Sequence, residues 1–469
     1  MNTSLKKSWG RNLLVIAILL MFSHFINAQE NYILYGFRGV PQSMSLNPAL
    51  TPDASLFIGI PAISNIEIGL LNTVGNYNDF FTRKPGSTVD NLDMSKVIQA
   101  GNNLGFTKIS INEDLLSAGF KIKNNFFTIG VSQRMSFTIL SDNDLFKLIW
   151  NDNTVNAGTT LYLNNTAIEE THMLDYHVGL SVPVTTKVTI GTRIHLLQGL
   201  SNIQTKNDGM NFTTQSDGNG GYDVYASSHL LLNTSGFQNN SNNNNNFNPG
   251  QYLSDFKNMG FAIDLGAAVK VTDQLNVSAS VLDLGAISYH SNTQSYRTDE
   301  NNVNLTGSLS EIFKSNNALS GLGDSLKRMF NASEFSNTYS VKLPTRLYIG
   351  AEYNLKQNGG RVSLLFASQF FKGYNNMAAS LGYDYSLGKH FNFKVNYTYI
   401  KEDPFNVGTA LSFQFKPIQL YLYTDNILTV SWKSSKYAQF GFGLNILFPN
   451  KNGEKKKLAP NAQTDIIEP

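Results

Sequence analysis

Cysteine is absent from all 469 residues of the chain. Disulfide bonds and thiolate chemistry are therefore excluded, whatever compartment the protein occupies. Charge is also scarce, because only 15% of the residues are Asp, Glu, Lys or Arg and the formal net charge is +2. This balance excludes a nucleic-acid binder that relies on bulk positive charge. After Phe22, no stretch is apolar over the roughly 18 residues that a membrane-spanning helix needs.

The N-terminus carries the one long apolar run, from Leu13 to Phe22, preceded by Lys6, Lys7 and Arg11. A basic start, an apolar stretch of about ten residues and a small residue at the cut are typical of a secretory signal peptide. We predict Sec export and cleavage after Ala28. The alternative is a retained N-terminal anchor, although the run is too short to span a bilayer. Since no cysteine follows the run, the lipoprotein route is excluded.

Alternation between apolar and small polar residues is clearest in the last strand candidate, Gln439–Phe448. Its even-numbered residues are Phe, Phe, Leu, Ile and Phe, whereas the odd-numbered ones are mostly Gln, Gly and Asn, with Leu447 as the exception. Neighbouring side chains of a strand point to opposite faces, so one face is apolar and the other small and polar. A soluble sandwich would cover its wet face with charge, whereas Gly and Asn suit the crowded interior of a barrel.

Four other strand candidates show the same segregation, at 173–182, 188–200, 260–270 and 390–400. In each, the charged residues share one face. A charge that faces lipid costs roughly 2–4 kcal/mol at the membrane midplane, so a lipid-facing wall requires this segregation. The charged residues predicted to face inward are Arg134, Asp175, Arg193, Asp264, Arg346, Glu352, Asp384 and Lys394.

Turn lengths alternate along the chain. Short connections are expected at 124–125, 183–187, 271–273, 357–360, 388–389 and 416–417. The remaining connections are longer, at 140–171, 202–258, 289–340 and 425–436. Short turns at one end and long loops at the other are typical of outer-membrane barrels, whose long loops lie outside the cell.

Within the long connections, short helices are expected at Met94–Leu104 and Asp144–Trp150, and a disordered loop tip at Asn239–Asn248. The segment Leu309–Phe330 is amphipathic. It is interpreted either as a lid or docking helix or as simple loop packing.

These patterns predict an all-β fold, a transmembrane antiparallel up-and-down β-barrel of about 14 strands in outer-membrane lipid, with an N-terminal plug segment and long extracellular loops. The predicted divisions are a signal peptide at 1–28, a plug or leader at 29–54, the barrel at 55–448 and a periplasmic tail at 449–469. Within the first strand candidate, Leu56–Leu71, Pro61 is expected to break the strand.

Three short motifs resemble known outer-membrane proteins. Ser45–Ala49 (Ser-Leu-Asn-Pro-Ala) resembles the Asn-Pro-Ala segment near the start of fatty-acid-transporter-type barrels, and Leu282–Gly285 and Leu343–Leu347 resemble the same superfamily. The chain is most similar to a Bacteroidota family of such barrels of unknown function, related to the accessory barrels of the type IX secretion system. The resemblance implies a barrel of fourteen strands with an N-terminal plug that occludes the lumen. The residues that it assigns to the plug are Asn47, Pro48 and Ala49.

Enzymatic motifs are weak. The catalytic motif of a lipase family matches Gly323-Asp324-Ser325-Leu326. However, this stretch lies in a helix-like loop, and no Asp-x-x-His sequence follows it. We therefore predict no catalytic residues. His172, His177 and His195 do not have zinc-site spacing and are interpreted as hydrogen-bonding residues, so no metal and no cofactor are expected.

The inward charges have two interpretations. The first is a salt-bridged interior that holds the plug and the strand register. In the second, Arg193 and Arg346 bind a carboxylate or another anionic group, with Asp264 and Glu352 also lining the lumen.

Two functions follow from these predictions. One is a plugged channel that passes small hydrophobic or amphipathic molecules. The other is a scaffold that does not transport and binds secretion or assembly partners or a surface lipoprotein. Neither involves an enzyme or a nucleic-acid partner.

Overall fold

A computed structural model describes residues 31–449, apart from positions 84, 87–89, 101–103, 151–155, 238–255, 306–321, 356–358, 389, 402 and 430–434. The predicted signal peptide, the Asn239–Asn248 tract, residues 309–321 of the amphipathic segment and the tail from residue 450 onward lie outside the described residues.

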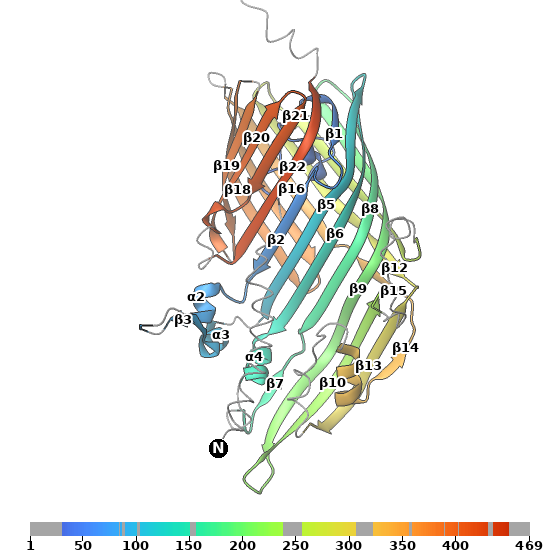
Figure 1. Cartoon of the computed structure of the whole chain (residues 1–469), viewed down its shortest axis with the longest axis vertical. Coiled ribbons are helices and arrows are strands. Elements are labelled where there is room, and N and C mark those ends of the chain that lie inside the picture. The colour runs from blue at the N-terminus through green and yellow to red at the C-terminus, as the bar shows by residue number, and fades with distance from the viewer. Residues whose placement is uncertain are drawn as a thin grey trace, which may run out of the picture.

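The wall is a closed antiparallel barrel with fourteen strand positions, which confirms the predicted fold class (Figure 1). Its first position is shared by two short strands, and its eighth position contains a short strand before the main one. The wall strands are β1 (Ala54–Gly59) with β2 (Ile66–Asn72), β5 (Leu104–Ile122), β6 (Asn125–Asp142), β8 (Ala167–Pro183), β9 (Val188–Ser216), β11 (Met259–Lys270), β12 (Leu275–Tyr289), β15 (Tyr339–Lys342) with β16 (Thr345–Asn354), β17 (Arg361–Phe371), β18 (Tyr374–Leu387), β19 (Phe391–Ile400), β20 (Asp403–Phe415), β21 (Ile418–Thr424) and β22 (Tyr437–Pro449).

The barrel closes where β22 meets the interrupted first strand. Strand β1 pairs with β22 from Ala54 opposite Pro449 to Gly59 opposite Asn445, and β2 continues the pairing with Ile66 opposite Phe442. Both short strands also pair with β5 on their other side. The interruption contains Pro61, which has no N–H to donate to a ladder, so the predicted break is confirmed.

Side-chain alternation separates outward-facing from lumen-facing residues as predicted. Phe261, Ile263 and Leu265 of β11 are 67%, 37% and 47% exposed, whereas Asp264 between them is 1% exposed. In β22, Phe440 and Phe448 lie on the outer face, and Leu447 is buried with Met44, Ala54, Phe57 and Phe126 in a small apolar cluster. The exterior is therefore apolar, whereas the charged side chains of the wall face the interior.

Two long connections that were expected to be loops are partly strands. Strand β9 continues to Ser216 and pairs with β10 (Tyr222–Ser235), which in turn pairs with β13 (Thr293–Asn304). The short strands β7 (Thr160–Tyr162) and β14 (Ser333–Phe335) pair with β9 and β13. We call β7, β10, β13, β14 and residues 199–216 of β9 the outer sheet, which projects beyond one end of the barrel (Figure 1).

The outer sheet was missed because its strands are rich in Asn, Ser and Thr, which weakens the apolar alternation. Burial nevertheless alternates along β10, where Val224, Ala226, Leu230 and Leu232 are all buried. Helix α7 (Leu322–Phe330) packs beside β13, and Phe330 joins an apolar cluster with Phe212 and Val224.

Short helices lie between the wall strands at the same end. They are α2 (Tyr77–Phe80), α3 (Met94–Ala100) and α4 (Asn143–Trp150), with the small hairpin of β3 (Phe81–Arg83) and β4 (Asp90–Leu92) between the first two. The predicted helices at 94–104 and 144–150 correspond to α3 and α4. Among the described residues, no helix is long and apolar enough to cross a membrane.

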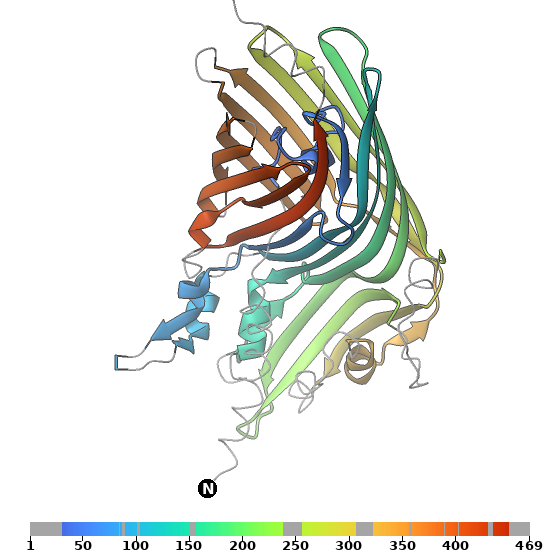
Figure 2. The same ribbon diagram turned by 45° about the horizontal axis from the view of Figure 1, so that its top comes forward.

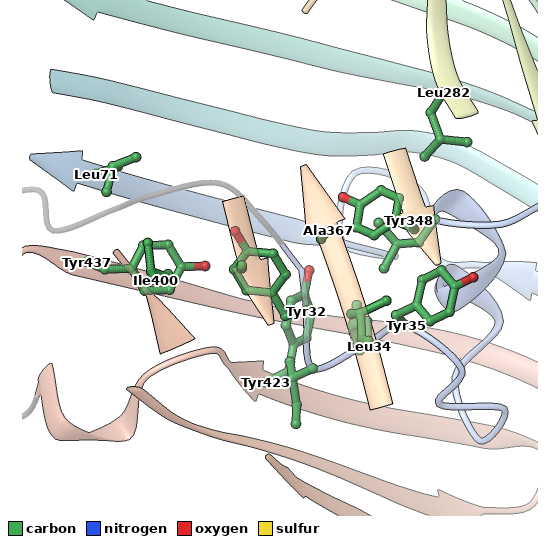
Figure 3. Close-up of a cluster of buried hydrophobic side chains, with 14 of the residues drawn as sticks. Tyr32, Leu34, Tyr35, Leu71, Leu282, Tyr348, Ala367, Ile400, Tyr423 and Tyr437 are labelled. Carbon is green, nitrogen blue, oxygen red and sulfur yellow. The ribbon is translucent and has the colours of Figure 1, made fainter. Parts of the chain in front are cut away.

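Residues 31–53, called here the interior segment, form no strand of the wall. They contain turns and one 3₁₀ helix, η1 (Pro41–Ser45), and lie inside the barrel (Figure 2). The segment runs along the lumen, because Tyr32 contacts Tyr437 at the start of β22 and the next strand, β1, pairs with Pro449 at its end. Figure 3 shows Tyr32, Leu34 and Tyr35 among side chains of the wall.

Candidate functional site

The interior segment is held by wall side chains that bind its backbone. Irregular backbone cannot satisfy its own polar groups, so a buried segment needs partners from its surroundings. Both carboxylate oxygens of Asp425 accept backbone N–H groups, from Tyr32 at 3.0 Å and from Ile33 at 2.7 Å. The Nζ atom of Lys394 donates to the carbonyl of Tyr35 at 2.6 Å. Charged groups of the wall thus provide the partners that a strand ladder would otherwise supply.

Two further wall side chains hold the second half of the segment. An Nη atom of Arg193 donates to the carbonyl of Met44 at 2.7 Å, and the Ser280 hydroxyl donates to the carbonyl of Leu46 at 2.6 Å. The contacts therefore come from β9 and β12 as well as from β19 and the end of β21, and they surround the segment.

Asn47 lies at a point where the segment closely approaches the wall. Its Nδ2 atom donates to the Tyr35 hydroxyl at 3.1 Å and to the Ala279 carbonyl at 3.2 Å, and its Oδ1 atom accepts the backbone N–H of Ala49 at 2.9 Å. This fully buried side chain therefore links two turns of the segment to β12.

Two glycines make room for that approach. Gly191 of β9 and Gly266 of β11 are directly paired across the two strands. A Cβ atom on Gly191 would overlap the backbone of Pro48 and Ala49, and one on Gly266 would overlap the side chain of Asn47. The three residues that the resemblance assigned to a plug thus pack against two paired glycines of the wall.

The four lumen residues singled out from the sequence all take part in ion pairs. Arg193 lies 3.3 Å from Asp264, and Arg346 lies 2.7 Å from Asp283. Glu352 pairs with Arg38 of the interior segment at 2.9 Å. Both arginines proposed as anion ligands therefore have carboxylate partners already.

Asp283 is the centre of the largest ion-pair group. It occupies a bulge between β11 and β12, with a positive φ of 59° that Asp tolerates better than most residues. Its backbone N–H donates to Asp264 at 2.8 Å, and its carboxylate binds Arg346 at 2.7 Å and Arg134 at 2.8 Å. Arg134 also reaches Asp175 at 3.3 Å.

The structure also brings together three residues whose proximity the sequence analysis did not anticipate. His177 of β8 lies directly opposite His195 of β9 in the strand register, with ring centroids 5.7 Å apart. Oδ1 of Asp175 is 2.8 Å from Nδ1 of His195 and 3.6 Å from Nδ1 of His177. The i, i+2 spacing of Asp175 and His177 indicated a shared face, but only the register of β8 against β9 adds His195.

Two of the cavities among the described residues lie inside the barrel, and Arg134 and Asn112 line both. The inner cavity, of about 120 Å³, is lined by the interior segment and by the charged residues around Asp175 and Asp283. The outer cavity, of about 70 Å³, lies where β9 leaves the barrel for the outer sheet. Its apolar lining is Met135, Met173, Ile203, Val341, Leu343 and Phe371, and its charged lining is Lys108, Arg134, Glu169 and Lys342.

The lipase-like motif occupies the start of α7 on the outer sheet, because that helix begins at Leu322. His172 lies on β8 but does not line the inner cavity, unlike His177 and His195.

Comparison with solved structures returns two toluene transporters and a FadL homologue among its matches. The Ralstonia pickettii toluene transporter TbuX is 11% identical, with 87% of this chain and 94% of that chain covered and a TM-score of 0.42. The Pseudomonas putida toluene transporter TodX is 10% identical, with 90% of this chain and 98% of that chain covered and a TM-score of 0.40. A Pseudomonas aeruginosa FadL homologue is 11% identical, with 87% of this chain and 94% of that chain covered and a TM-score of 0.43. No curated protein matches the chain.

One family model does match, over residues 48–425, a range that includes the Pro48–Ala49 contact, the ion pairs around Asp283 and most of the outer sheet. Because this range is most of the chain, the protein belongs to the family of unknown function DUF5723.

Proposed function

We propose that the protein is an outer-membrane channel for small hydrophobic or amphipathic molecules, and that residues 29–54 plug its lumen. The observation that carries this proposal is the set of hydrogen bonds from Asp425, Lys394 and Arg193 to the backbone of the interior segment. Such contacts hold a segment in one position, yet each can be exchanged for a bond to water when the segment moves.

The exterior supports a location in lipid. Apolar side chains face outward on strands such as β11, and the charged side chains of the same strands face the lumen. Since a lipid-facing charge costs roughly 2–4 kcal/mol at the midplane, this division suits a membrane wall. The tight turns and the start of β1 would then face the periplasm, and the outer sheet would face the exterior.

The outer cavity suits one end of an amphipathic molecule. Apolar side chains line it together with Lys108, Arg134 and Lys342, which would attract an anionic group. Its volume of about 70 Å³ is well below the roughly 300–1,000 Å³ of a typical small-molecule pocket. A larger molecule therefore passes only if the interior segment or the surrounding side chains move.

The test compares the mature chain with a variant that lacks residues 31–50, both reconstituted in liposomes. Uptake of a hydrophobic or amphipathic dye should rise in the deletion variant, because the lumen would no longer be filled. Lys394→Met is a milder version that removes one contact and should give a smaller rise. Arg83→Ala, on the exposed β3–β4 hairpin, is the control. Unchanged uptake in both lumen variants, with normal folding, would contradict the proposal.

A second candidate function rests on the outer sheet. Its apolar clusters give it a core of its own, which Ile168 of β8 joins to the barrel, as expected for a platform that binds a secretion or assembly partner or a surface lipoprotein. Mild-detergent purification from native membranes should then recover a complex of fixed stoichiometry. Recovery of the monomer alone would argue against this candidate.

A further inference from the structure

A group of ionisable side chains beside the inner cavity has a composition that an ordinary ion-pair network does not explain. The carboxylates that line this cavity belong to Glu67, Asp114, Asp175, Asp264 and Asp283. The guanidinium groups belong to Arg134, Arg193 and Arg346. Five carboxylates face three guanidinium groups, so the lining lacks two positive charges. The deficit equals the charge of one divalent cation.

His195 lies between two of these carboxylates. Its Nδ1 atom is 2.8 Å from Oδ1 of Asp175, and its Nε2 atom is 3.1 Å from Oδ2 of Asp264. A neutral imidazole has one N–H and one lone pair, so it can donate to only one of them. If the proton is on Nε2, the lone pair of Nδ1 faces an oxygen of Asp175, and a metal ion can bind between these two atoms.

His177 supplies a third ligand at the same place. Its Nδ1 atom has no hydrogen-bond partner in the described part of the chain and lies 3.6 Å from Oδ1 of Asp175. One ligand atom from each of Asp175, His177 and His195 falls within 4.8 Å of the others. Ligand atoms around a tetrahedral zinc ion are separated by about 3.3 Å, since the bonds are about 2.0–2.1 Å long. Small side-chain rotations would therefore complete the set.

The surroundings hold these ligands in place. The other oxygen of Asp175, Oδ2, accepts a bond from Arg134 at 3.3 Å, so Oδ1 remains directed at the histidines. Gly130 of β6 lies opposite His177, and a Cβ atom there would overlap the imidazole ring. Asp264 lies behind His195, in the position from which a carboxylate typically orients a metal-binding histidine.

We propose that Asp175, His177 and His195 bind a divalent transition-metal ion such as Zn²⁺ inside the barrel. Two imidazoles and one carboxylate form a mixed nitrogen and oxygen set, which suits zinc and its neighbours better than Ca²⁺ or Mg²⁺. Asp264 is the positioning residue. The inner cavity of about 120 Å³ has room for water at the remaining coordination positions. The ion joins β8 to β9 and neutralises the lining, and this role does not depend on transport.

The test uses the tag-free mature chain, purified in detergent, stripped with a chelator and exposed to Zn²⁺ or Co²⁺ before desalting. The wild type should retain one metal ion per chain by elemental analysis. His177→Gln and His195→Gln should lose it. Asp264→Asn should lower the affinity about 10–100-fold, as changes to such orienting carboxylates do. His172 lies on β8, as His177 does. His172→Gln is therefore the matched control and should bind the metal ion like the wild type.

Two readouts keep the result interpretable. Heat-dependent gel mobility shows whether each variant has a folded barrel. The visible spectrum of the wild type with Co²⁺ requires no variant, and strong d–d bands of a four- or five-coordinate nitrogen-containing site are expected. A wild type that retains no metal would overturn the proposal and assign a second proton to His195 instead. Retention in the folded His177→Gln variant equal to the wild type would overturn it as well.

Discussion

The interior segment and the outer sheet are both additions to the same barrel, yet they satisfy their backbones in different ways. The outer sheet uses strand ladders, so its side chains are left to form apolar clusters around Phe212 and Phe330. The interior segment has no ladder, and the wall provides Asp425, Lys394 and Arg193 for its backbone. Both regions pack apolar side chains, so they differ in how the backbone is satisfied: by strand ladders in one region and by buried wall side chains in the other.

The largest expected effect comes from the buried charges. Asp283→Asn keeps the shape and tolerates the positive φ, but removes the carboxylate shared by Arg134 and Arg346. Breaking a buried ion pair by removing one partner costs about 3–5 kcal/mol. Chemical denaturation of the folded barrel in detergent micelles measures the loss. A cost below about 1 kcal/mol would mean that water already screens the group.

A loss of similar size is expected in the outer sheet, but confined to it. Phe330 is 1% exposed in the apolar cluster that α7 forms with the outer sheet, and Phe330→Ala leaves a cavity there. Truncating a buried Phe to Ala costs about 3–5 kcal/mol. Limited proteolysis should cleave the outer sheet faster while the barrel keeps its heat-dependent gel mobility. Simultaneous loss of both would show that the two regions fold as one unit.

A smaller effect is expected where the segment touches the wall. Gly266→Val places a side chain against Asn47 and costs about 1–3 kcal/mol, as overpacking does. Protease access to residues 31–53 should increase. Ala267→Val changes the next residue of the same strand, on the opposite face, and should leave the segment protected. Equal protection in the two variants would show that the close approach is not needed.

The smallest effect is expected at an exposed ion pair of the outer sheet. Asp299→Asn is the same type of change as Asp283→Asn. The Asp299 side chain pairs with His229 but is 79% exposed. Exposed pairs contribute about 0–1 kcal/mol, so the unfolding midpoint should barely move. A loss comparable to that of Asp283→Asn would remove the contrast between buried ion pairs of the barrel and exposed ones of the outer sheet.

Much of the wall could be predicted from the chain because its alternation is local. Phe261, Asp264 and Leu265 reveal their faces through a period of two residues, because successive side chains of a strand point to opposite faces. The outer sheet was hidden because Ser and Thr replace apolar residues in β10, and pairing with β9 and β13 stabilises it in place of a strong pattern. The contact of Asn47 with Gly266 joins parts of the chain that no local pattern relates.

By itself the sequence determined the fold class, the inward direction of the charges and the tight turns at one end of the barrel, since each depends on neighbouring residues. It missed the equally short connections at the other end, between β17 and β18 and between β19 and β20. The tertiary structure alone decided which charges meet. Arg346 meets Asp283 and His195 meets Asp175 because strand register and barrel closure set those distances. Register depends on pairing energies summed along whole strands, which no single residue encodes.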